Sequence, residues 1–223
     1  SAIDIVEAAL GYENLDLIGV HCHIGSQIFD RAPFELAAEV MMDFVREVKV
    51  KFGHEISELN LGGGFGIKYL EEHDPRDIDE IVKTAVDAVR AKAGEFGLKE
   101  PKLIIEPGRS IVAPSGITVY TVGAVKEIKG IRTYASIDGG MTDNPRFALY
   151  ESQYTIEAVQ KMDQPKDMVI TLAGRCCESG DLIGRDMQIQ KIGAGDLVAV
   201  LATGAYNYSM ASNYNRVPRP PVI

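Results

Sequence analysis

Short apolar runs alternate with longer amphipathic segments through the first half of the chain, and this alternation limits the possible folds more than any other feature. The runs are typical of buried strands and cover residues 15–25, 56–64 and 101–110. The segments repeat apolar residues at helical spacing and cover residues 33–53 and 76–97. Strands and helices in alternation require crossovers between parallel strands. We therefore expect an α/β unit with a parallel sheet over residues 1–115.

The second half of the chain has a different pattern. After the turn sequence APSG at 113–116, runs rich in β-branched residues follow one another, separated by turn signals and with few helical stretches. This pattern is typical of an all-β domain. We expect such a domain over residues 116–223, with the boundary near residue 115.

Composition and charge exclude several classes of protein. With 223 residues, 46% of them hydrophobic, the chain can bury a substantial core. Its formal net charge of -9 argues against binding to nucleic acid or to an anionic membrane, since both select a basic face. No apolar run approaches the roughly 18 residues of a membrane span, and the first residues lack a secretory signal pattern. We expect a cytoplasmic protein with a small-molecule partner.

The three cysteines, Cys22, Cys176 and Cys177, are too few for a disulfide framework, and they lack the paired spacing of a zinc site. We interpret them as thiols in a reducing compartment and expect no metal site.

Polar or glycine-rich clusters follow each of the three expected strands of the first half. They read HCHIGSQ at 21–27, NLGGGFG at 60–66 and EPGRS at 106–110. In parallel barrels and open α/β sheets, binding sites form at the C-terminal ends of strands because the loops converge there. The alternative is that each cluster is merely a turn. Three clusters in register favour a shared site.

The triple glycine suits an anion that approaches the backbone closely. Gly62, Gly63 and Gly64 can present successive N–H groups in a concave nest, and Ser26 can add a hydroxyl donor. Such a set fits a phosphate dianion. The run matches neither the nucleotide-triphosphate loop nor the dinucleotide fingerprint. A tight turn after the strand remains the alternative.

Glu106 and Arg109 allow two interpretations. Glu106 ends an apolar strand, so we expect a carboxylate in surroundings of low dielectric that needs a partner. Arg109, three residues on, is the nearest candidate for a structural ion pair. The other interpretation is that Glu106 faces a protonated ring nitrogen of a cofactor and Arg109 faces an anion.

Six motifs together carry a resemblance to a known family. In order they are HCHIGSQ, GGGFG, EPGRS, DNPRFALY at 143–150, CESGD at 177–181 and GAYNYSMASNYN at 204–215. Their order and approximate spacing resemble the diaminopimelate decarboxylases, which are pyridoxal-phosphate enzymes of the alanine-racemase-like fold. The resemblance begins near residue 15. It implies part of a parallel (β/α) barrel, residues 1–115, that binds the cofactor. It also implies a mostly antiparallel β domain, residues 116–223, that supplies substrate and dimer contacts.

The resemblance implies roles for the cofactor-binding residues. His23 would stack on the pyridine ring, whereas a satisfied core histidine is the structural alternative. Ser26, Tyr206 and the backbone of Gly62, Gly63 and Gly64 would bind the phosphate. Glu106 would keep the pyridine nitrogen protonated, so that the ring accepts the electrons left by loss of CO₂.

The resemblance also implies the substrate-binding residues. Arg109, Arg146 and Tyr150 would grip the distal carboxylate of meso-diaminopimelate, and Tyr206 would line the same pocket. Without the family match, Arg146 would be an ordinary surface arginine. The loop with Cys177 and Glu178 would reach into the site of a second subunit of a homodimer. There Cys177 would donate a proton and Glu178 would contact the distal ammonium.

One family feature is absent from the sequence. In the family a lysine on the first barrel strand binds the cofactor covalently, in a context like Y-A-x-K-A-N, and no such segment occurs here. We therefore expect a fragment of a longer polypeptide that begins midway round the barrel, ends before the β domain is complete and is inactive alone. The complete enzyme would convert meso-diaminopimelate to lysine and CO₂. The alternatives are a decarboxylase of ornithine or arginine, and a relative that binds cofactor without catalysis.

Overall fold

A computed structural model describes all 223 residues, Ser1–Ile223. The chain divides into two compact units. Unit 1 comprises Ser1–Ile67 and Asp74–Pro107, and unit 2 comprises Lys68–His73 and Gly108–Ile223. The second unit therefore begins a few residues before the boundary expected near residue 115, and it takes in a short segment from the first half. Each unit is described by itself.

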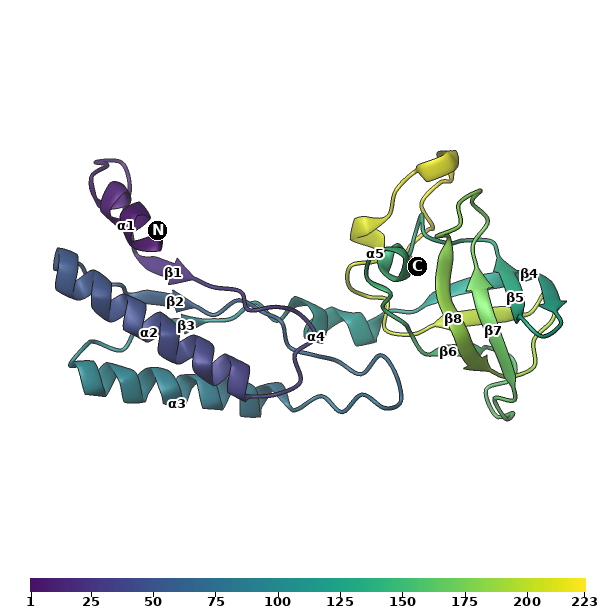
Figure 1. Cartoon of the computed structure of the whole chain (residues 1–223), viewed down its shortest axis with the longest axis horizontal. Coiled ribbons are helices and arrows are strands. Elements are labelled where there is room, and N and C mark those ends of the chain that lie inside the picture. Colours follow the sequence, from purple (N-terminus) through teal and green to yellow (C-terminus); the bar gives the residue numbers. More distant parts are fainter. The chain divides into compact units, whose positions relative to one another are not determined.

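Unit 1 is a parallel sheet with two long helices. Its elements are α1 (Ala2–Leu10), β1 (Gly19–His21), α2 (Ala32–Phe52), β2 (Glu58–Asn60), α3 (Ile78–Phe96) and β3 (Lys102–Ile104). The strands lie in the order β1-β2-β3, and both pairs are parallel, as Figure 1 shows. The strand–helix alternation thus predicted the sheet correctly. The strands are shorter than the apolar runs that indicated them.

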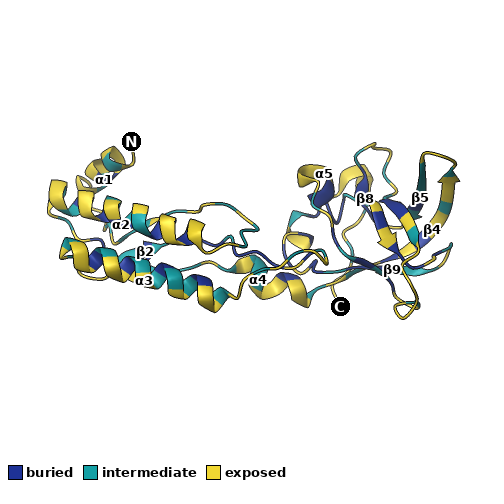
Figure 2. Ribbon diagram, turned by 60° about the horizontal axis from the view of Figure 1, so that its bottom comes forward, coloured by how far each residue is buried: buried dark blue, intermediate teal, exposed yellow.

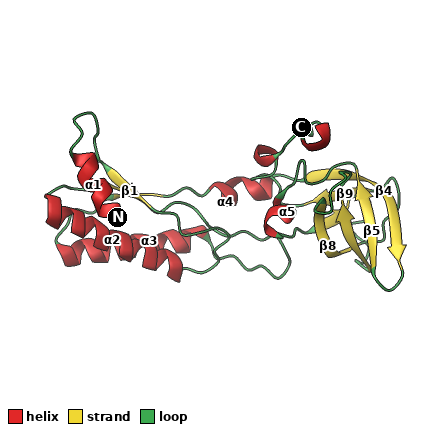
Figure 3. Cartoon of the chain, turned by 45° about the horizontal axis from the view of Figure 1, so that its top comes forward, coloured by secondary structure: helices red, strands yellow, loops and turns green.

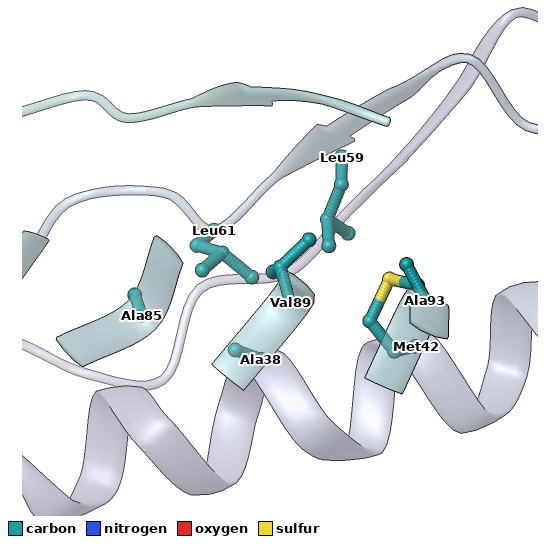
Figure 4. Packing of buried hydrophobic residues seen from close by; sticks show 7 residues of the cluster. All are labelled: Ala38, Met42, Leu59, Leu61, Ala85, Val89 and Ala93. Atoms are coloured by element: carbon teal, nitrogen blue, oxygen red, sulfur yellow. The ribbon is translucent and has the colours of Figure 1, made fainter. Parts of the chain in front are cut away.

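Both long helices pack on β2 through small and apolar side chains. α2 contributes Ala38 and Met42, α3 contributes Val89, and the strand contributes Leu59. Figure 4 shows these side chains converging between the helices and the strand. The buried positions of each helix recur every three or four residues, which leaves the outer faces exposed in Figure 2. Burial of this stripe fixes the helices against the sheet.

Glycines end both helices where the sequence pattern placed the ends. Gly53 follows α2 with φ 68° and Gly97 follows α3 with φ 64°. Both are in the left-handed region, which a residue without a side chain adopts at little cost. The predicted helical segments 33–53 and 76–97 are confirmed.

Unit 2 is built on one six-stranded sheet. Its strands are β4 (Thr118–Ile128), β5 (Arg132–Ile137), β6 (Ile156–Ala158), β7 (Met168–Ala173), β8 (Leu182–Ile189) and β9 (Leu197–Val200). They lie in the order β6-β9-β4-β5-β7-β8, and every pair is antiparallel except β5 with β7. The expected mostly antiparallel domain is confirmed. Figure 3 shows how strongly the sheet curves.

The curved sheet is nearly closed, because a side chain joins its two outermost strands. Gln190, directly after β8, accepts a hydrogen bond from the N–H of Ala158 on β6 at 2.9 Å. Gln190 is buried and also donates to Glu157 at 2.8 Å. This contact covers backbone groups that an open sheet would leave unpaired.

Several short elements carry no clear signal in the sequence. They are the helices α4 (Gly108–Val112) and α5 (Arg146–Tyr150) and the 3₁₀ turns η1 (Ala113–Ser115), η2 (Tyr208–Met210) and η3 (Tyr214–Arg216). The strands β6 and β8 and the first helix, α1, were not predicted either. In β8, Gly184 and charged residues interrupt the apolar alternation that marks a strand. No helix of the chain is both long and apolar enough to span a bilayer.

Candidate active site

Three loops of unit 1 meet beyond the ends of its strands. The side chain of Gln27, after β1, donates to the carbonyl of Ile67 at 2.7 Å and accepts from its N–H at 3.2 Å. Ile28 forms a parallel bridge with Phe65, and the N–H of Gly63 donates to His23 Nδ1 at 3.4 Å. The loops after β1 and β2 are therefore joined at three points.

The triple glycine exists because neighbouring main chains fill the space on both sides. A Cβ on Gly62 would lie 2.6 Å from the carbonyl oxygen of Cys22, and one on Gly64 would lie 2.4 Å from that of Gly25. On the other side, a Cβ on Gly63 would lie 2.3 Å from the carbonyl oxygen of Glu106. Any side chain here would push apart the loops that carry the expected site residues.

The amides of the triple glycine are not equally available. The N–H of Gly62 donates to Asn60 Oδ1 at 2.8 Å, and the N–H of Gly63 points to His23. The N–H of Gly64 has no acceptor within the chain, and Gly64 has φ 100°. Ser26 is exposed on the adjoining loop. Of the expected nest, the Gly64 amide is the one left open to an external acceptor.

The carboxylate of Glu106 is oriented by an asparagine that the sequence did not single out. Asn60 Nδ2 donates to Glu106 Oε1 at 2.8 Å, while Oε2 lies 3.9 Å from Nε2 of His21. The Glu106 side chain is 56% exposed rather than enclosed by its strand. Leu103, on β3, and Ile105 pack against the clusters formed with α2 and α3, so these side chains do not enclose the Glu106 carboxylate. Asn60 thus links the glycine loop to the acid.

Two arginines of unit 2 stack on tyrosine rings. Arg146, on α5, is 6% exposed, and its guanidinium donates to the hydroxyl of Tyr154 at 3.2 Å. No carboxylate lies within ion-pair distance of Arg146. Arg109, on α4, donates to the hydroxyl of Tyr69 at 2.5 Å and stacks over the ring of Tyr206 at 4.8 Å. A buried cation without an acid, as Arg146 is, is costly unless an anion approaches it.

Tyr150 and Tyr206 are accessible. Tyr150 ends α5 and is 63% exposed, and Tyr206 is 43% exposed with φ 64°. A tyrosine in the left-handed region is uncommon and persists only where its surroundings require it. The stacking of Arg109 on its ring is one such constraint. Both side chains are placed where a small molecule could reach them.

The turn with the candidate proton donor is anchored by a buried acid. Cys177 and Glu178 are exposed in the turn between β7 and β8. Asp181, 3% exposed, accepts the N–H of Cys176 and the N–H of Met141, both at 2.6 Å. The turn is thereby joined to the segment that leads into α5. Burial, together with the Asp181 carboxylate, raises the pKa of the Cys176 thiol.

The described contacts assemble the expected residues as two groups. His23, the three glycines and Glu106 come together in unit 1, and Ser26 is exposed on the loop that carries His23. The arginines and Tyr206 come together in unit 2. Sequence reasoning missed Asn60, Gln27, Tyr69, Tyr154 and Asn207. Gln27, Asn60 and Asn207 lie within the quoted motifs, but nothing in those motifs assigns them a role, so the signal that identifies all five is their contact with other residues of the fold.

Comparison with known families decides the class of this site. The family model described as pyridoxal-dependent decarboxylase, pyridoxal binding domain, matches residues 1–113. The chain belongs to the pyridoxal-dependent decarboxylases. This membership confirms the resemblance inferred from the six motifs and the pyridoxal cofactor expected from it.

Individual members of this decarboxylase family resemble the whole chain. The diaminopimelate decarboxylase of Bacillus subtilis (strain 168) is 47% identical over 98% of this chain and 50% of its own length. The crystal structure of the diaminopimelate decarboxylase of M. jannaschii with L-lysine has a TM-score of 0.88 and 38% identity. That match covers 98% of this chain and 49% of that one. A lysine/ornithine decarboxylase of Vibrio vulnificus, solved with cadaverine, is 26% identical, with a TM-score of 0.81 over 98% of this chain and 56% of that one. The chain spans about half the length of the curated relatives it matches.

The residues of unit 1 fit the pyridoxal family. An amide without an acceptor at Gly64 and an exposed hydroxyl at Ser26 are donors suited to a phosphate. The Glu106 carboxylate, oriented by Asn60, is an acceptor suited to a protonated ring nitrogen. An exposed imidazole at His23 offers a flat face for stacking.

Proposed function

We propose that the complete protein containing this chain decarboxylates meso-diaminopimelate to lysine and CO₂ with pyridoxal 5'-phosphate. The names of the relatives support the reaction, and the donors and acceptors of unit 1 support the cofactor. Ser26, Tyr206 and the Gly62–Gly64 backbone would bind the phosphate, with the Gly64 amide as the main backbone donor. His23 would stack on the ring.

The chain's own residues would control the protons of the reaction. When bound, pyridoxal phosphate supplies a protonated ring that takes up the electron pair left when the bond to the departing carboxylate breaks. Glu106 Oε2 would hold the proton at the ring nitrogen, since Oε1 already accepts from Asn60. The exposed thiol of Cys177 would donate a proton to the carbon that has lost CO₂.

The substrate assignment depends mainly on one observation, the buried guanidinium of Arg146 without a carboxylate partner. Such a cation is stabilised by a bound anion. Meso-diaminopimelate carries a second carboxylate at the end that does not react. Arg109, Arg146 and Tyr150 would bind this distal carboxylate, and Glu178 would bind the distal ammonium. Ornithine has no second carboxylate to place beside Arg146.

The test is an assay of CO₂ release by the complete gene product with pyridoxal phosphate. Meso-diaminopimelate, ornithine and arginine are compared at equal concentrations. We expect release from diaminopimelate and at least about a hundredfold lower kcat/KM with the other two, because the buried arginine would lack its anion. Activity on ornithine or arginine alone would overturn the substrate assignment. Cofactor binding with no release from any of the three would indicate a non-catalytic relative.

We further propose a cytoplasmic homodimer in which each site takes Cys177 and Glu178 from the partner subunit. The exposed position of both side chains at the tip of an anchored turn supports a role beyond their own unit. The free cysteines are consistent with a reducing compartment.

A further inference from the structure

One tyrosine ring of unit 2 serves both arginines of the candidate site. The guanidinium carbon of Arg146 lies 4.9 Å from the centre of the Tyr69 ring, and that of Arg109 lies 5.6 Å from it. The hydroxyl of Tyr69 also accepts from Arg109 at 2.5 Å. Tyr69 is 5% exposed, so these contacts form away from water, where the attraction between a cation and a ring face is strongest.

The position of Tyr69 is set by its backbone. Its carbonyl oxygen accepts from the N–H of Thr155 at 2.9 Å and from the Thr155 hydroxyl at 2.8 Å. Its ring packs edge-on against Tyr154 with centroids 5.2 Å apart. Tyr154 in turn accepts from Arg146. Thr155 and Tyr154 thus hold Tyr69 from two sides, and the ring cannot shift without moving both arginines.

Two guanidiniums near one ring repel each other, and the ring offsets part of that repulsion. Each cation is attracted to the negative π-system, and one of them also donates to the phenol oxygen. The Tyr154 hydroxyl donates onward to Asn207 Oδ1 at 3.4 Å, while the buried Nδ2 of Asn207 has no acceptor. Arg146 has no carboxylate partner and Asn207 Nδ2 has no acceptor, so a bound carboxylate would complete this side of the cluster.

We propose that Tyr69 is the positioning residue that sets the spacing of Arg109 and Arg146, so that both bind one carboxylate of the substrate. The proposal rests on the proposed function, in which that carboxylate is the distal one. Tyr69 acts through the arginines and touches no reacting atom. Its loss should weaken recognition of the carboxylate far more than it affects the chemical step.

The test uses two ligands that differ only in this carboxylate. Loss of CO₂ from one end of diaminopimelate leaves lysine, which keeps the distal carboxylate, and cadaverine is the same diamine without it. The inhibition constants of L-lysine and cadaverine are measured with the complete, cofactor-loaded enzyme and two variants. Tyr69→Phe keeps the ring and removes the hydroxyl, and Tyr69→Leu removes both.

For Tyr69→Phe we expect the inhibition constant of L-lysine to rise about tenfold, because a charged hydrogen bond is lost. That of cadaverine should change less than about twofold, and KM for diaminopimelate should rise with kcat nearly unchanged. Tyr69→Leu should raise the inhibition constant of L-lysine further, to about thirtyfold or more above that of the unmodified enzyme. The melting temperature is recorded for each protein. Tyr134→Phe, which removes a hydroxyl on β5 that interacts with Arg132 and with neither arginine of the cluster, is the matched control. The control should leave the ratio of the two constants unchanged.

Equal changes for lysine and cadaverine in the tyrosine variants would overturn the proposal and leave Tyr69 a purely structural residue. An unchanged lysine constant in Tyr69→Phe with a native melting temperature would overturn it as well. Failure of the proposed function is seen separately, since the unmodified enzyme would then release no CO₂ from diaminopimelate.

Discussion

Single residues of the glycine loop show how close packing of main chains restricts the sequence. Gly62 and Gly64 have positive φ, which favours glycine by itself. Gly63 does not have a positive φ. A side chain at this position is excluded only because the carbonyl of Glu106 occupies the space. Asn60, which orients the Glu106 carboxylate through its amide nitrogen, uses its amide oxygen to hold the same loop. Loop geometry and acid orientation are therefore coupled through one side chain.

This packing makes Gly63→Ala a strongly destabilising change. A methyl group 2.3 Å from the Glu106 carbonyl oxygen must displace backbone, and we expect a loss of about 2 kcal/mol or more in the free energy of unfolding. Gly94→Ala is the matched control, because Gly94 lies in α3 with nothing within 4 Å of an added Cβ. It should stabilise the chain by about 0.5–1 kcal/mol. Urea denaturation measures both, and equal stability of the two variants would contradict the packing argument.

At the scale of elements, buried acids join the strands of unit 2 to the turns that carry site residues. Asp181 ties the β7–β8 turn to the segment before α5. Asp143, 7% exposed, accepts from the hydroxyl of Tyr120 on β4 and from the N–H of Gly140 at 3.0 Å. The carboxylates of Asp143 and Asp181 lie close enough for their charges to interact. The two acids thus anchor the segments that carry Arg146 and Cys177, and each acid belongs to the same sequence motif as the residue it positions.

Burial raises the pKa of Asp143, although hydrogen bonds from Tyr120, Gly140 and Thr142 act in the opposite direction. A raised pKa means that the folded state binds the proton more tightly than the unfolded state. The contribution of this group to stability is then fully present below its ordinary pKa and is lost as pH rises through the folded value. Asp143→Asn has no such loss, so its stability relative to the unmodified chain should improve from pH 4 toward neutral pH.

Asp196 provides a control of opposite sign for the same measurement. The hydrogen bond from Lys161 and that from the N–H of Gly193 lower the pKa of Asp196. Its stabilising contribution is present above its ordinary pKa and is lost as pH falls through the folded value. Asp196→Asn should therefore become relatively less stable toward neutral pH. Urea midpoints at a series of pH values separate the two cases, and parallel curves for both variants would refute the assignment for Asp143.

At the scale of the whole molecule, the proposed dimer makes each site depend on two subunits. In the complete protein, Glu106→Ala and Cys177→Ala should each be nearly inactive alone. After the two variants are unfolded or dissociated and reassembled together, half of the dimers are mixed, and each mixed dimer has one site with both native residues. We expect recovery of about a quarter of the unmodified activity. Mixed dimers that form without any recovery would show that both residues act within one subunit.

Local sequence patterns were sufficient to predict the main elements of unit 1 and the family of the chain. Helical periodicity and the closing glycines predicted α2 and α3, strand–helix alternation predicted the parallel sheet, and six short motifs indicated the pyridoxal family. These signals lie within a few turns or one loop of the chain, where spacing alone carries the information. The sequence did not predict β8, the hairpin partner of β7. This strand is stabilised by its neighbours in the sheet and lacks a regular alternation of apolar and polar residues.

Three features were visible only in the folded chain: the main-chain contacts that require three glycines, the amide of the loop that has no acceptor, and the tyrosine that contacts both arginines. Asn60 and Glu106 are 46 residues apart, and Tyr69 and Arg109 are 40 apart. Contacts over such separations depend on strand register and on which loops converge. Neither is encoded in the residues on either side of Asn60 or Tyr69, so sequence could name the chemistry of the site but not the side chains that orient it.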